Sequence, residues 1–338
     1  MGHVNIGVIG VGYWGPNLVR NFNNTPGARV AAVCDIDPNK LRSIHVNYPS
    51  IKLFENFSEL LQCTDIDAVA IATPVHTHYA LTKQALNANK HVLIEKPITS
   101  SSNEAQELVE LSIKKNLVLL VDHTFVYMGA VRKLHTLVRS GELGDINYYD
   151  SLRVNLGLFQ NDVNAIWDLA VHDIAILHYL FENSPIAVSS TGMSHVLGQP
   201  ENVAYITLFY NTNMITHINV NWLSPVKIRQ TLISGSKKMV FFDDLHPSEK
   251  IKIYDSGVSV KTKEDMYKTL IEYRMGDILI PTYDRKEALA VEAEHFVRCI
   301  LFGEKPLTHG EFGLHVVKII EAANFSLRNM GRHTEIRI

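Results

Sequence analysis

A lysine and an aspartate–histidine pair are the side chains in this sequence best suited to chemistry. Lys96 stands in Glu95-Lys96-Pro97, directly after the apolar run 91–94. If that run is a buried parallel strand, the lysine faces the ligand cleft, where its ammonium can hydrogen-bond a substrate hydroxyl and favour the alkoxide. This position favours a functional role over that of a solvated loop lysine.

Asp168 and His172 are four residues apart in the stretch W-D-L-A-V-H-D. At the start of a helix this spacing puts both side chains on one face, where an imidazole beside a carboxylate can act as a general base near neutral pH. The spacing is equally consistent with Asp168 as a helix N-cap and His172 as an interface histidine. For Asp173 a structural or helix-dipole role is expected.

A glycine-rich turn near the N-terminus predicts a dinucleotide site. The apolar stretch 4–9 leads into G-V-G-Y-W-G, which has the G-x-G-x-x-G spacing. The first glycine permits a tight turn, the second the approach of a pyrophosphate, and the third close packing of helix on strand. The pyrophosphate would lie at the N-terminus of a helix expected at about 16–22. The cofactor contacts expected here are Gly10, Gly12, Tyr13, Trp14 and Gly15.

Asp35 indicates which dinucleotide is bound. The second apolar strand, 29–34, ends in Asp35, twenty residues after Gly15. A carboxylate there can accept hydrogen bonds from both hydroxyls of the adenosine ribose. It would repel a 2′-phosphate, and Ile36 beside it offers no cation, so we expect NAD rather than NADP. The weaker alternative is that the glycine motif is a purely structural turn and that Asp-Ile-Asp-Pro at 35–38 is only a turn-forming segment.

Strands and helices alternate along the chain to about residue 124, which predicts a parallel sheet covered by helices on both faces. Ligands bind outside the carboxyl ends of such strands. The strand ends and the following helix therefore bring more candidate cofactor contacts to the same cleft: Thr73, Pro74, His78, Glu95 and Lys96.

From residue 125 the apolar residues alternate with a period of two, which predicts a large, mostly antiparallel open sheet. The expected strands are 147–155, 186–195, 203–210, 214–222, 228–234, 239–242 and 251–254. Helices are expected at 169–181, 286–302 and 311–329. We therefore predict an α/β protein with a Rossmann NAD-binding domain (1–124) and an α+β substrate-binding and oligomerisation domain (125–338). Its last helix, 311–329, could pack back on the first domain.

Composition excludes several classes of function. The 338 residues are 46% apolar and carry a formal net charge of −3, which argues against a nucleic-acid partner. The spacing of the three cysteines and the histidines predicts neither a disulfide framework nor a metal site. No apolar run is long enough for a transmembrane helix and no signal-peptide pattern is present, so we expect a cytoplasmic protein without a membrane partner. Neither G-x-S-x-G nor a Walker loop occurs, which argues against serine hydrolysis and phosphoryl transfer.

Taken together, the motifs resemble one oxidoreductase family. The order G-V-G-Y-W-G, Asp35, A-T-P-V-H-T-H, E-K-P and D-L-A-V-H-D is similar to the glucose–fructose oxidoreductase/inositol dehydrogenase/MocA (Gfo/Idh/MocA) family over essentially the whole chain. The resemblance implies that Lys96, Asp168 and His172 form the catalytic group, and so favours the functional interpretation of the last two. It also implies a homodimer or homotetramer.

The stretch from Arg153 to Leu169 resembles a narrower branch that acts in bacterial surface-polysaccharide and amino-sugar pathways, including UDP-N-acetylglucosaminuronate 3-dehydrogenases. The branch implies an NAD-dependent dehydrogenase or ketoreductase of a sugar or nucleotide sugar. Hydride would move between a ring alcohol carbon, C3, and nicotinamide C4. The expected substrate contacts lie near the catalytic pair in the sequence: Arg153, Asn155, Asn161 and Trp167. A structural strand arginine is the alternative for Arg153.

Three other functions stay open at this point. The chain could be an inositol or monosaccharide dehydrogenase, or an NAD-dependent glycosidase that oxidises its sugar transiently, as some members of the family do. It could also be a non-catalytic dinucleotide sensor built on the same fold. The presence of Lys96, Asp168 and His172 argues against a sensor, which has no need of all three.

Overall fold

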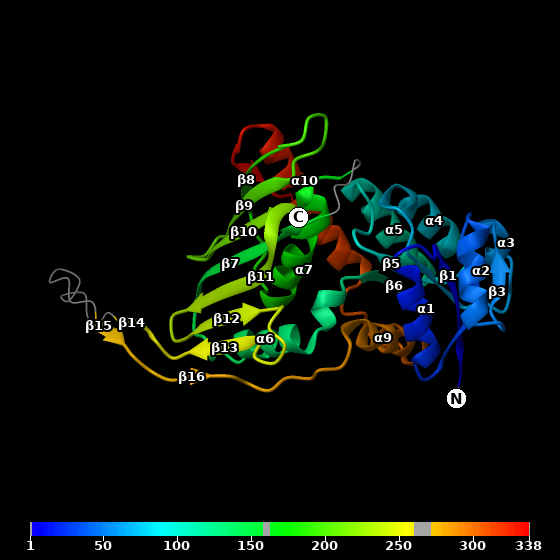
Figure 1. Ribbon diagram of the computed structural model, residues 1–338, viewed down its shortest axis with the longest axis horizontal. Helices are drawn as coiled ribbons and strands as arrows, with labels where there is room; N and C mark the ends of the chain where they lie inside the picture. The colour runs from blue at the N-terminus through cyan, green and yellow to red at the C-terminus, as the bar shows by residue number, and fades with distance from the viewer. Residues whose placement is uncertain (1, 158–162, 260–271, 338) are drawn as a thin grey trace. The chain divides into compact units, whose positions relative to one another are not determined.

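Two compact units make up the protein in this computed structural model, which describes residues 2–157, 163–259 and 272–337 (Figure 1). The first unit contains Met1–Met128 and Lys286–Lys318, and the second contains Gly129–Arg285 and Ile319–Ile338. The first has a parallel sheet and the second a large, mostly antiparallel one, which confirms the predicted α/β fold class.

The sheet of the first unit is entirely parallel and has the strand order β3-β2-β1-β4-β5-β6. This is the order of a dinucleotide-binding fold, and its direction reverses between β1 and β4. Most central-strand residues are buried and apolar, as expected where helices cover both faces. The strands are β1 Val4–Ile9, β2 Ala28–Cys34, β3 Lys52–Phe54, β4 Ala68–Ile71, β5 His91–Glu95 and β6 Leu119–Asp122.

Helices connect these strands on both sides of the sheet. They are α1 Gly15–Asn24, α2 Pro38–Asn47, α3 Phe57–Leu61, α4 Val75–Asn87 and α5 Ser102–Lys115, followed by the 3-10 helix η1 Thr124–Tyr127. Side chains begin two of them, because Asp37 and Asn56 each accept a hydrogen bond from the backbone N–H two residues ahead. The helices thereby start directly at the strand-end loops.

A helix from late in the chain completes the core of the first unit. One face of α9 (Ala288–Phe302) buries Leu289, Ala293, Phe296 and Val297, which follow helical spacing. The ring of Phe296 lies 6.1 Å from that of Phe22 in α1, in an edge-to-face arrangement. The sequence predicted a single domain boundary after residue 124. In the structure the chain crosses between the units more than once, because residues 286–318 return to the first unit.

The second unit is built on a nine-stranded sheet of order β16-β13-β12-β11-β7-β10-β9-β8-β17. All neighbours are antiparallel except β7 and β10, which run parallel. The strands are β7 Ile146–Leu156, β8 Ala187–Met193, β9 Val203–Phe209, β10 Ile215–Asn221, β11 Leu223–Gly235, β12 Met239–Asp243, β13 Ile251–Tyr254, β16 Ile278–Leu279 and β17 Thr334–Glu335. A separate two-stranded sheet joins β14 Gly257–Ser259 to β15 Glu272–Arg274.

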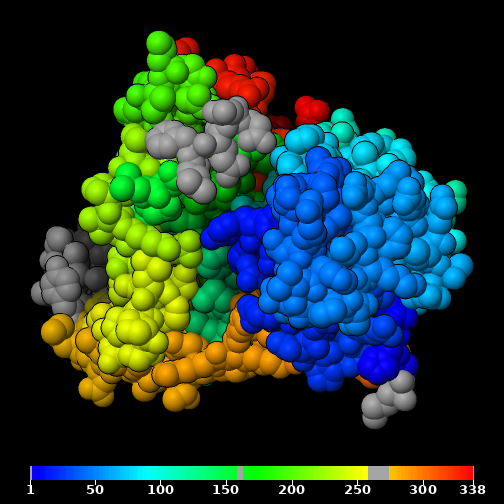
Figure 2. All heavy atoms as spheres, turned by 45° about the vertical axis from the view of Figure 1, so that its right-hand side comes forward, coloured from blue at the N-terminus to red at the C-terminus, as the bar shows by residue number. Residues whose placement is uncertain are grey.

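Side-chain burial alternates along β9 and β10, so one face of this sheet is covered and the other is more open, as the period of two predicted. The helices of the unit are α6 Gly129–Arg139, α7 Val171–Leu180 and the later part of α10 Gly310–Arg328. Most side chains of the segment 274–285, orange in Figure 2, are exposed. Among the described residues, no helix is both long and apolar enough to span a membrane.

The helix predicted at 169–181 begins earlier than expected, with a π-helical turn, η2 Ile166–Ala170, that leads directly into α7. The Asn164 side chain starts this turn by accepting a hydrogen bond from the Trp167 N–H at 3.3 Å. A π turn widens the backbone spiral, and such turns occur frequently at functional sites. Asp168 therefore lies in the π turn and His172 in the first turn of α7.

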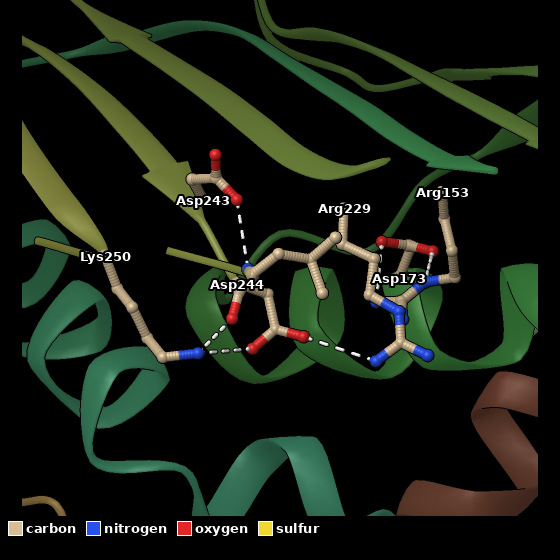
Figure 3. A network of polar contacts seen from close by, with 7 residues as sticks. Arg153, Asp173, Arg229, Asp243, Asp244 and Lys250 are labelled. Carbon is tan, nitrogen blue, oxygen red and sulfur yellow. Dashed lines mark hydrogen bonds and ion pairs between the residues drawn. The ribbon is translucent and has the colours of Figure 1, made fainter. Parts of the chain in front are cut away.

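A buried ion pair attaches α7 to the sheet (Figure 3). Asp173 accepts hydrogen bonds from Arg153 Nε at 2.6 Å, Arg153 Nη2 at 3.2 Å and Ser151 Oγ at 2.6 Å. The Arg153 and Asp173 side chains are only 4% and 2% exposed. Burial opposes the charge on Arg153, but the charge and hydrogen bonds of Asp173 outweigh it and raise the pKa of the guanidinium.

A second arginine makes this region a network. Arg229 on β11 lies directly across from Arg153 on β7, and like charges in that position repel. Asp244 compensates by accepting from Arg229 Nη1 at 3.3 Å and from Lys250 Nζ at 3.0 Å (Figure 3). The two acidic side chains therefore neutralise the cross-strand pair of arginines beneath the helix that carries His172.

Asp173→Asn tests how far this ion pair stabilises the second unit. The substitution leaves Arg153 buried without its counter-charge, so we expect the free energy of unfolding to fall by about 3 kcal/mol. Asp65→Asn is the control, because it removes an exposed partner of Lys52 and should cost less than about 1 kcal/mol. Urea denaturation measures both variants. Equal losses in the two would contradict a stabilising role for the buried pair.

Candidate active site

The three glycines of the G-x-G-x-x-G turn meet three different environments. Gly10 has a φ of +83°, and a Cβ there would lie 2.6 Å from the Ala72 carbonyl oxygen. A Cβ on Gly15 would lie 2.0 Å from the carbonyl oxygen of Gly10, whereas a Cβ on Gly12 would meet no atom within 4 Å. Gly10 thus allows the turn to lie against the residues that follow β4, and Gly15 allows the start of α1 to lie against the end of β1. Gly12 leaves open space where a pyrophosphate can approach backbone N–H groups.

The carboxylate of Asp35 is held against this turn. Its Oδ2 accepts from the Val11 N–H at 2.8 Å, its Oδ1 accepts from the Asp37 N–H at 2.9 Å, and the residue is 8% exposed. The open space at Gly12 and an oriented acid at the end of β2 fit the two ends of an adenosine diphosphate. A cation that the sequence argument overlooked lies close by, since Lys40 Nζ is 3.9 Å from Asp35 Oδ1.

His78 joins two strand-end loops. Its Nδ1 lies 2.8 Å from the Pro97 carbonyl oxygen and its Nε2 lies 2.8 Å from the Thr73 carbonyl oxygen. The ring is 1% exposed, and burial lowers the pKa of His78 despite these two carbonyls. Each ring nitrogen faces a backbone carbonyl, and the one that carries the proton donates to its carbonyl, so the geometry favours a loop-positioning role over the predicted direct contact with the cofactor. Thr73, in one of these loops, is partly exposed, and Pro74 beside it is exposed.

The end of β5 carries Glu95 and Lys96, both partly exposed. Glu95 Oε2 accepts a hydrogen bond from the backbone N–H of Lys96 at 3.0 Å. Glu95 also pairs in register with Asp122 at the end of β6. The Lys96 side chain therefore starts from the carboxyl edge of the sheet, where the sequence placed it.

Trp14 and Tyr13, both predicted cofactor contacts, behave differently. Tyr13 is 92% exposed, whereas the Trp14 indole N–H donates to Asp122 Oδ2 at 3.2 Å. Asp122 was missed at the sequence level, although its position gave a signal. It ends a predicted strand, as Asp35 and Glu95 do.

Asp168 and His172 lie on one continuous helical segment in the second unit, and both are half-buried. The indole N–H of Trp222, a fully buried residue after β10, donates to Asp168 Oδ2 at 3.1 Å. Trp222 is a further residue that the sequence argument did not single out. It gives the carboxylate of Asp168 a fixed orientation.

The predicted substrate contacts lie in different surroundings. Arg153 is buried in the ion pair with Asp173, which favours the structural role left open for it. Asn155 on β7 and Trp167 in the π turn are partly exposed, and Asn161 lies outside the described residues. Asn164, which was not predicted, donates through its amide to Glu201 Oε2 at 3.0 Å and Asn324 Oδ1 at 2.8 Å.

Within the described part of the chain, no group of three or more His, Cys, Asp or Glu side chains could hold a metal ion.

Each unit has its own set of candidate residues. The first carries the glycine turn, Asp35 and Lys96, and the second carries Asp168 and His172.

Family comparisons identify what this combination of domains is. Residues 4–123 match the profile of an oxidoreductase family with an NAD-binding Rossmann fold, and residues 131–241 match the Gfo/Idh/MocA C-terminal domain. The chain belongs to the Gfo/Idh/MocA oxidoreductase family. It is therefore an enzyme of the oxidoreductase class with NAD as its cofactor, in agreement with the glycine turn and Asp35.

Several relatives of this Gfo/Idh/MocA protein are sugar dehydrogenases. UDP-N-acetylglucosamine 3-dehydrogenase of Acidithiobacillus ferrooxidans is 30% identical over 93% of this chain and 94% of its own length. D-apiose dehydrogenase of Paraburkholderia graminis is 21% identical over 98% of this chain and 89% of its own. Inositol 2-dehydrogenase of Corynebacterium glutamicum is 28% identical over 54% of this chain and 56% of its own.

Solved structures share the fold over the full length. The structure of the A. ferrooxidans UDP-N-acetylglucosamine 3-dehydrogenase GnnA superposes with a TM-score of 0.81 at 23% identity, covering 98% of this chain and 100% of that one. That of GenD2 from gentamicin A biosynthesis, in complex with NAD, gives a TM-score of 0.84 at 20% identity, covering 100% and 97%. At these identities the structural likeness shows the fold.

Gly12→Ala and Gly15→Ala separate the two roles of the glycine turn. Gly15→Ala places a methyl group against the Gly10 carbonyl, so we expect a loss of about 1–3 kcal/mol of stability. Gly12→Ala adds a methyl group in open space, so stability should be kept while NAD affinity falls about tenfold or more. Thermal unfolding and calorimetric NAD titration measure the two effects. A Gly12→Ala variant that binds NAD as the parent does would refute the proposed pyrophosphate position.

Proposed function

We propose that this protein is an NAD-dependent dehydrogenase or ketoreductase of a nucleotide sugar, acting on the ring alcohol at C3. The main support is the match at 30% identity, over nearly the full length of both chains, to a UDP-N-acetylglucosamine 3-dehydrogenase. The candidate substrates are UDP-N-acetylglucosamine and its uronic acid, in bacterial amino-sugar or surface-polysaccharide synthesis. Cytoplasmic location and a homodimer or homotetramer stay predictions from the sequence.

Three side chains of this chain would carry the reaction. Bound NAD supplies the hydride acceptor, nicotinamide C4. His172 takes the proton of the C3 hydroxyl as general base, and Asp168 supports the positive charge that the imidazole then gains. Lys96 donates a hydrogen bond to the same oxygen and stabilises its developing negative charge. In ketone reduction the same groups act in the opposite direction.

The geometry within each unit is suited to these roles. Asp168 is oriented by the Trp222 indole, and the helix that bears His172 is attached to the sheet by the buried pair of Asp173 and Arg153. A rigid base costs less reorganisation during proton transfer than a mobile one. On the first unit, Lys96 follows a buried strand whose end is fixed by the hydrogen bond between its own N–H and Glu95.

Two dehydrogenase substrates and two other mechanisms compete with this proposal. Partial similarity to an inositol 2-dehydrogenase favours inositol or a free monosaccharide as the alternative substrate. If NADH accumulates with UDP-sugars but not with inositol, the substrate is a nucleotide sugar. An aryl glycoside that releases its phenol without net NADH would decide for the glycosidase mechanism. A sensor would bind NAD without reducing it in the presence of any sugar.

Lys96→Ala tests the proposed chemistry. Without the ammonium, the developing oxyanion loses a hydrogen-bond donor, so kcat with UDP-N-acetylglucosamine or its uronic acid should fall about 10²–10³-fold. NAD affinity should stay nearly unchanged, because the glycine turn and Asp35 are intact. Stopped-flow absorbance of NADH and calorimetric NAD titration measure the two quantities.

The matched control is Lys83→Ala, which removes an exposed lysine of α4 that pairs with Glu107. Its turnover should equal that of the parent protein. Near-normal turnover in Lys96→Ala would remove Lys96 from the catalytic group. His172→Ala should also lose turnover, by about 10²–10⁴-fold, if the imidazole is the base.

A further inference from the structure

Three carboxyl groups of the first unit lie next to one another behind the cofactor turn. Glu95 and Asp122 are partners in the register of the parallel strands β5 and β6, so their side chains project from the same face of the sheet. Glu292 on α9 interacts electrostatically with both, and neither of its carboxyl oxygens has a hydrogen-bond partner among the described residues. Asp122 is 1% exposed and Glu292 is 0% exposed. Three negative charges so close together and so poorly hydrated would be strongly unfavourable.

Asp122 differs from the other two carboxyl groups in having two side-chain hydrogen-bond donors. Its Oδ2 accepts from the Trp14 indole N–H at 3.2 Å, and its Oδ1 accepts from the Thr124 hydroxyl. Both groups can stabilise an ionised carboxylate, since each donates a hydrogen bond to it. One of these donors, Trp14, belongs to the glycine-rich cofactor turn.

Glu292, in contrast, has no N–H donor for either of its oxygens among the described residues. The nearby hydroxyl protons are already used. The single proton of Thr124 goes to Asp122, and that of Thr308 goes to the Val121 carbonyl at 2.7 Å, so the Tyr127 hydroxyl at 3.1 Å must donate to Thr308. What remains for Glu292 is the Asp122 carboxylate, which is an acceptor. A hydrogen bond between them requires a proton on Glu292.

We propose that Glu292 is a neutral carboxylic acid that positions the cofactor turn. Its O–H donates to the Asp122 carboxylate, which in turn accepts the indole N–H of Trp14. The chain Glu292–Asp122–Trp14 thereby fixes a turn residue between Gly12 and Gly15 from a helix at the other end of the sequence. This role rests on NAD binding by the first unit and is independent of the sugar that the enzyme takes.

The electrostatics of the cluster agree with this geometry. Burial, and then the neighbouring Asp122 carboxylate, raise the pKa of Glu292 well above its ordinary value. Burial and Asp122 also raise the pKa of Glu95, which the charge of Lys96 opposes. A further titratable group facing Glu292 is Tyr127 on η1. Its burial, and then the charge of Glu292, raise the pKa of its hydroxyl well above the ordinary value. The cation on α1 nearest to α9, Arg20, is instead paired with Glu287.

The raised pKa of Glu292 makes the stability of the protein depend on pH. The folded protein holds a proton on Glu292 that the unfolded chain releases above its ordinary pKa of about 4.3. Stability from this residue is therefore complete below that value and is lost as pH rises through the folded-state pKa. Ionised Glu292 would repel Asp122 and loosen Trp14, so NAD affinity should also fall at alkaline pH.

Glu292→Gln and Glu292→Met test the proposal as a pair of similar size. Glutamine keeps a neutral donor for Asp122, so NAD affinity should match the parent near pH 6 and stay constant to about pH 9. The parent should instead bind NAD more weakly as pH rises through the pKa of Glu292, by about tenfold for each unit by which NAD binding raises that pKa. Methionine removes the donor, so NAD should bind more weakly at every pH. Calorimetric titration with NAD alone measures all three proteins.

Infrared spectroscopy detects the proposed proton on Glu292 directly. A Glu292 side chain that only fills space would give no such signal. The C=O band of a protonated carboxylic acid should be present at neutral pH in the parent and weaker by the contribution of one carboxyl group in Glu292→Gln. It should be retained in Glu287→Gln, the control that removes the exposed partner of Arg20 near the start of the same helix. An unchanged band in Glu292→Gln, or a glutamine variant that weakens NAD binding as much as methionine does, would overturn the proposal. Neither readout involves sugar turnover, so the failure of the proposed function would leave this test intact.

Discussion

The close contact between the start of α1 and the end of β1 is the constraint on which the cofactor half of the structure depends. Gly15 can lie against the Gly10 carbonyl only because it has no side chain. The contact aims the N-terminus of α1 at the carboxyl edge of the parallel sheet, where its free N–H groups can bind phosphate. Asp35, Thr73 and Lys96 reach the same edge because their strands, or the loops that follow them, are aligned in register with β1.

The protein buries charge in two different ways around its candidate residues. In the second unit, Arg153 and Asp173 neutralise each other within hydrogen-bonding distance, which makes the loss of either partner costly. In the first unit, a proton shared between Glu292 and Asp122 takes the place of a counter-ion in our proposal. Both arrangements hold a functional segment, the helix of His172 or the turn of Trp14, against the sheet behind it.

Much of the fold could be predicted from local patterns. Apolar strands that alternate with helices indicated the parallel sheet, and the period of two indicated the second sheet, because both depend on residues close in sequence. The parallel pairing of β7 with β10 was not predictable, since alternation carries no information about strand direction. The return of α9 to the first unit was equally hidden, because an amphipathic helix does not show which surface it will cover.

Part of the candidate site could also be predicted from residues close in sequence. Gly10, Gly15 and Asp35 were found from spacing, because their geometry is set within one βαβ unit. The partners of Trp14 and Asp168 are 108 and 54 residues away in sequence, so no local pattern could show that Asp122 meets Trp14 or that Trp222 meets Asp168. The expected contacts of Arg153 and His78 were assigned from position alone. The structure gives both residues buried polar partners instead, because a buried polar group needs its hydrogen bonds satisfied.

The most direct test of the central claim is the fate of deuterium placed at C3 of UDP-N-acetylglucosamine or of its uronic acid. After incubation of the protein with labelled sugar and NAD, our account predicts reduced cofactor that carries the deuterium at nicotinamide C4. It also predicts a slower rate than with unlabelled sugar. Reduced cofactor without deuterium, or label retained at C3 while NADH accumulates, would contradict the proposed oxidation at C3.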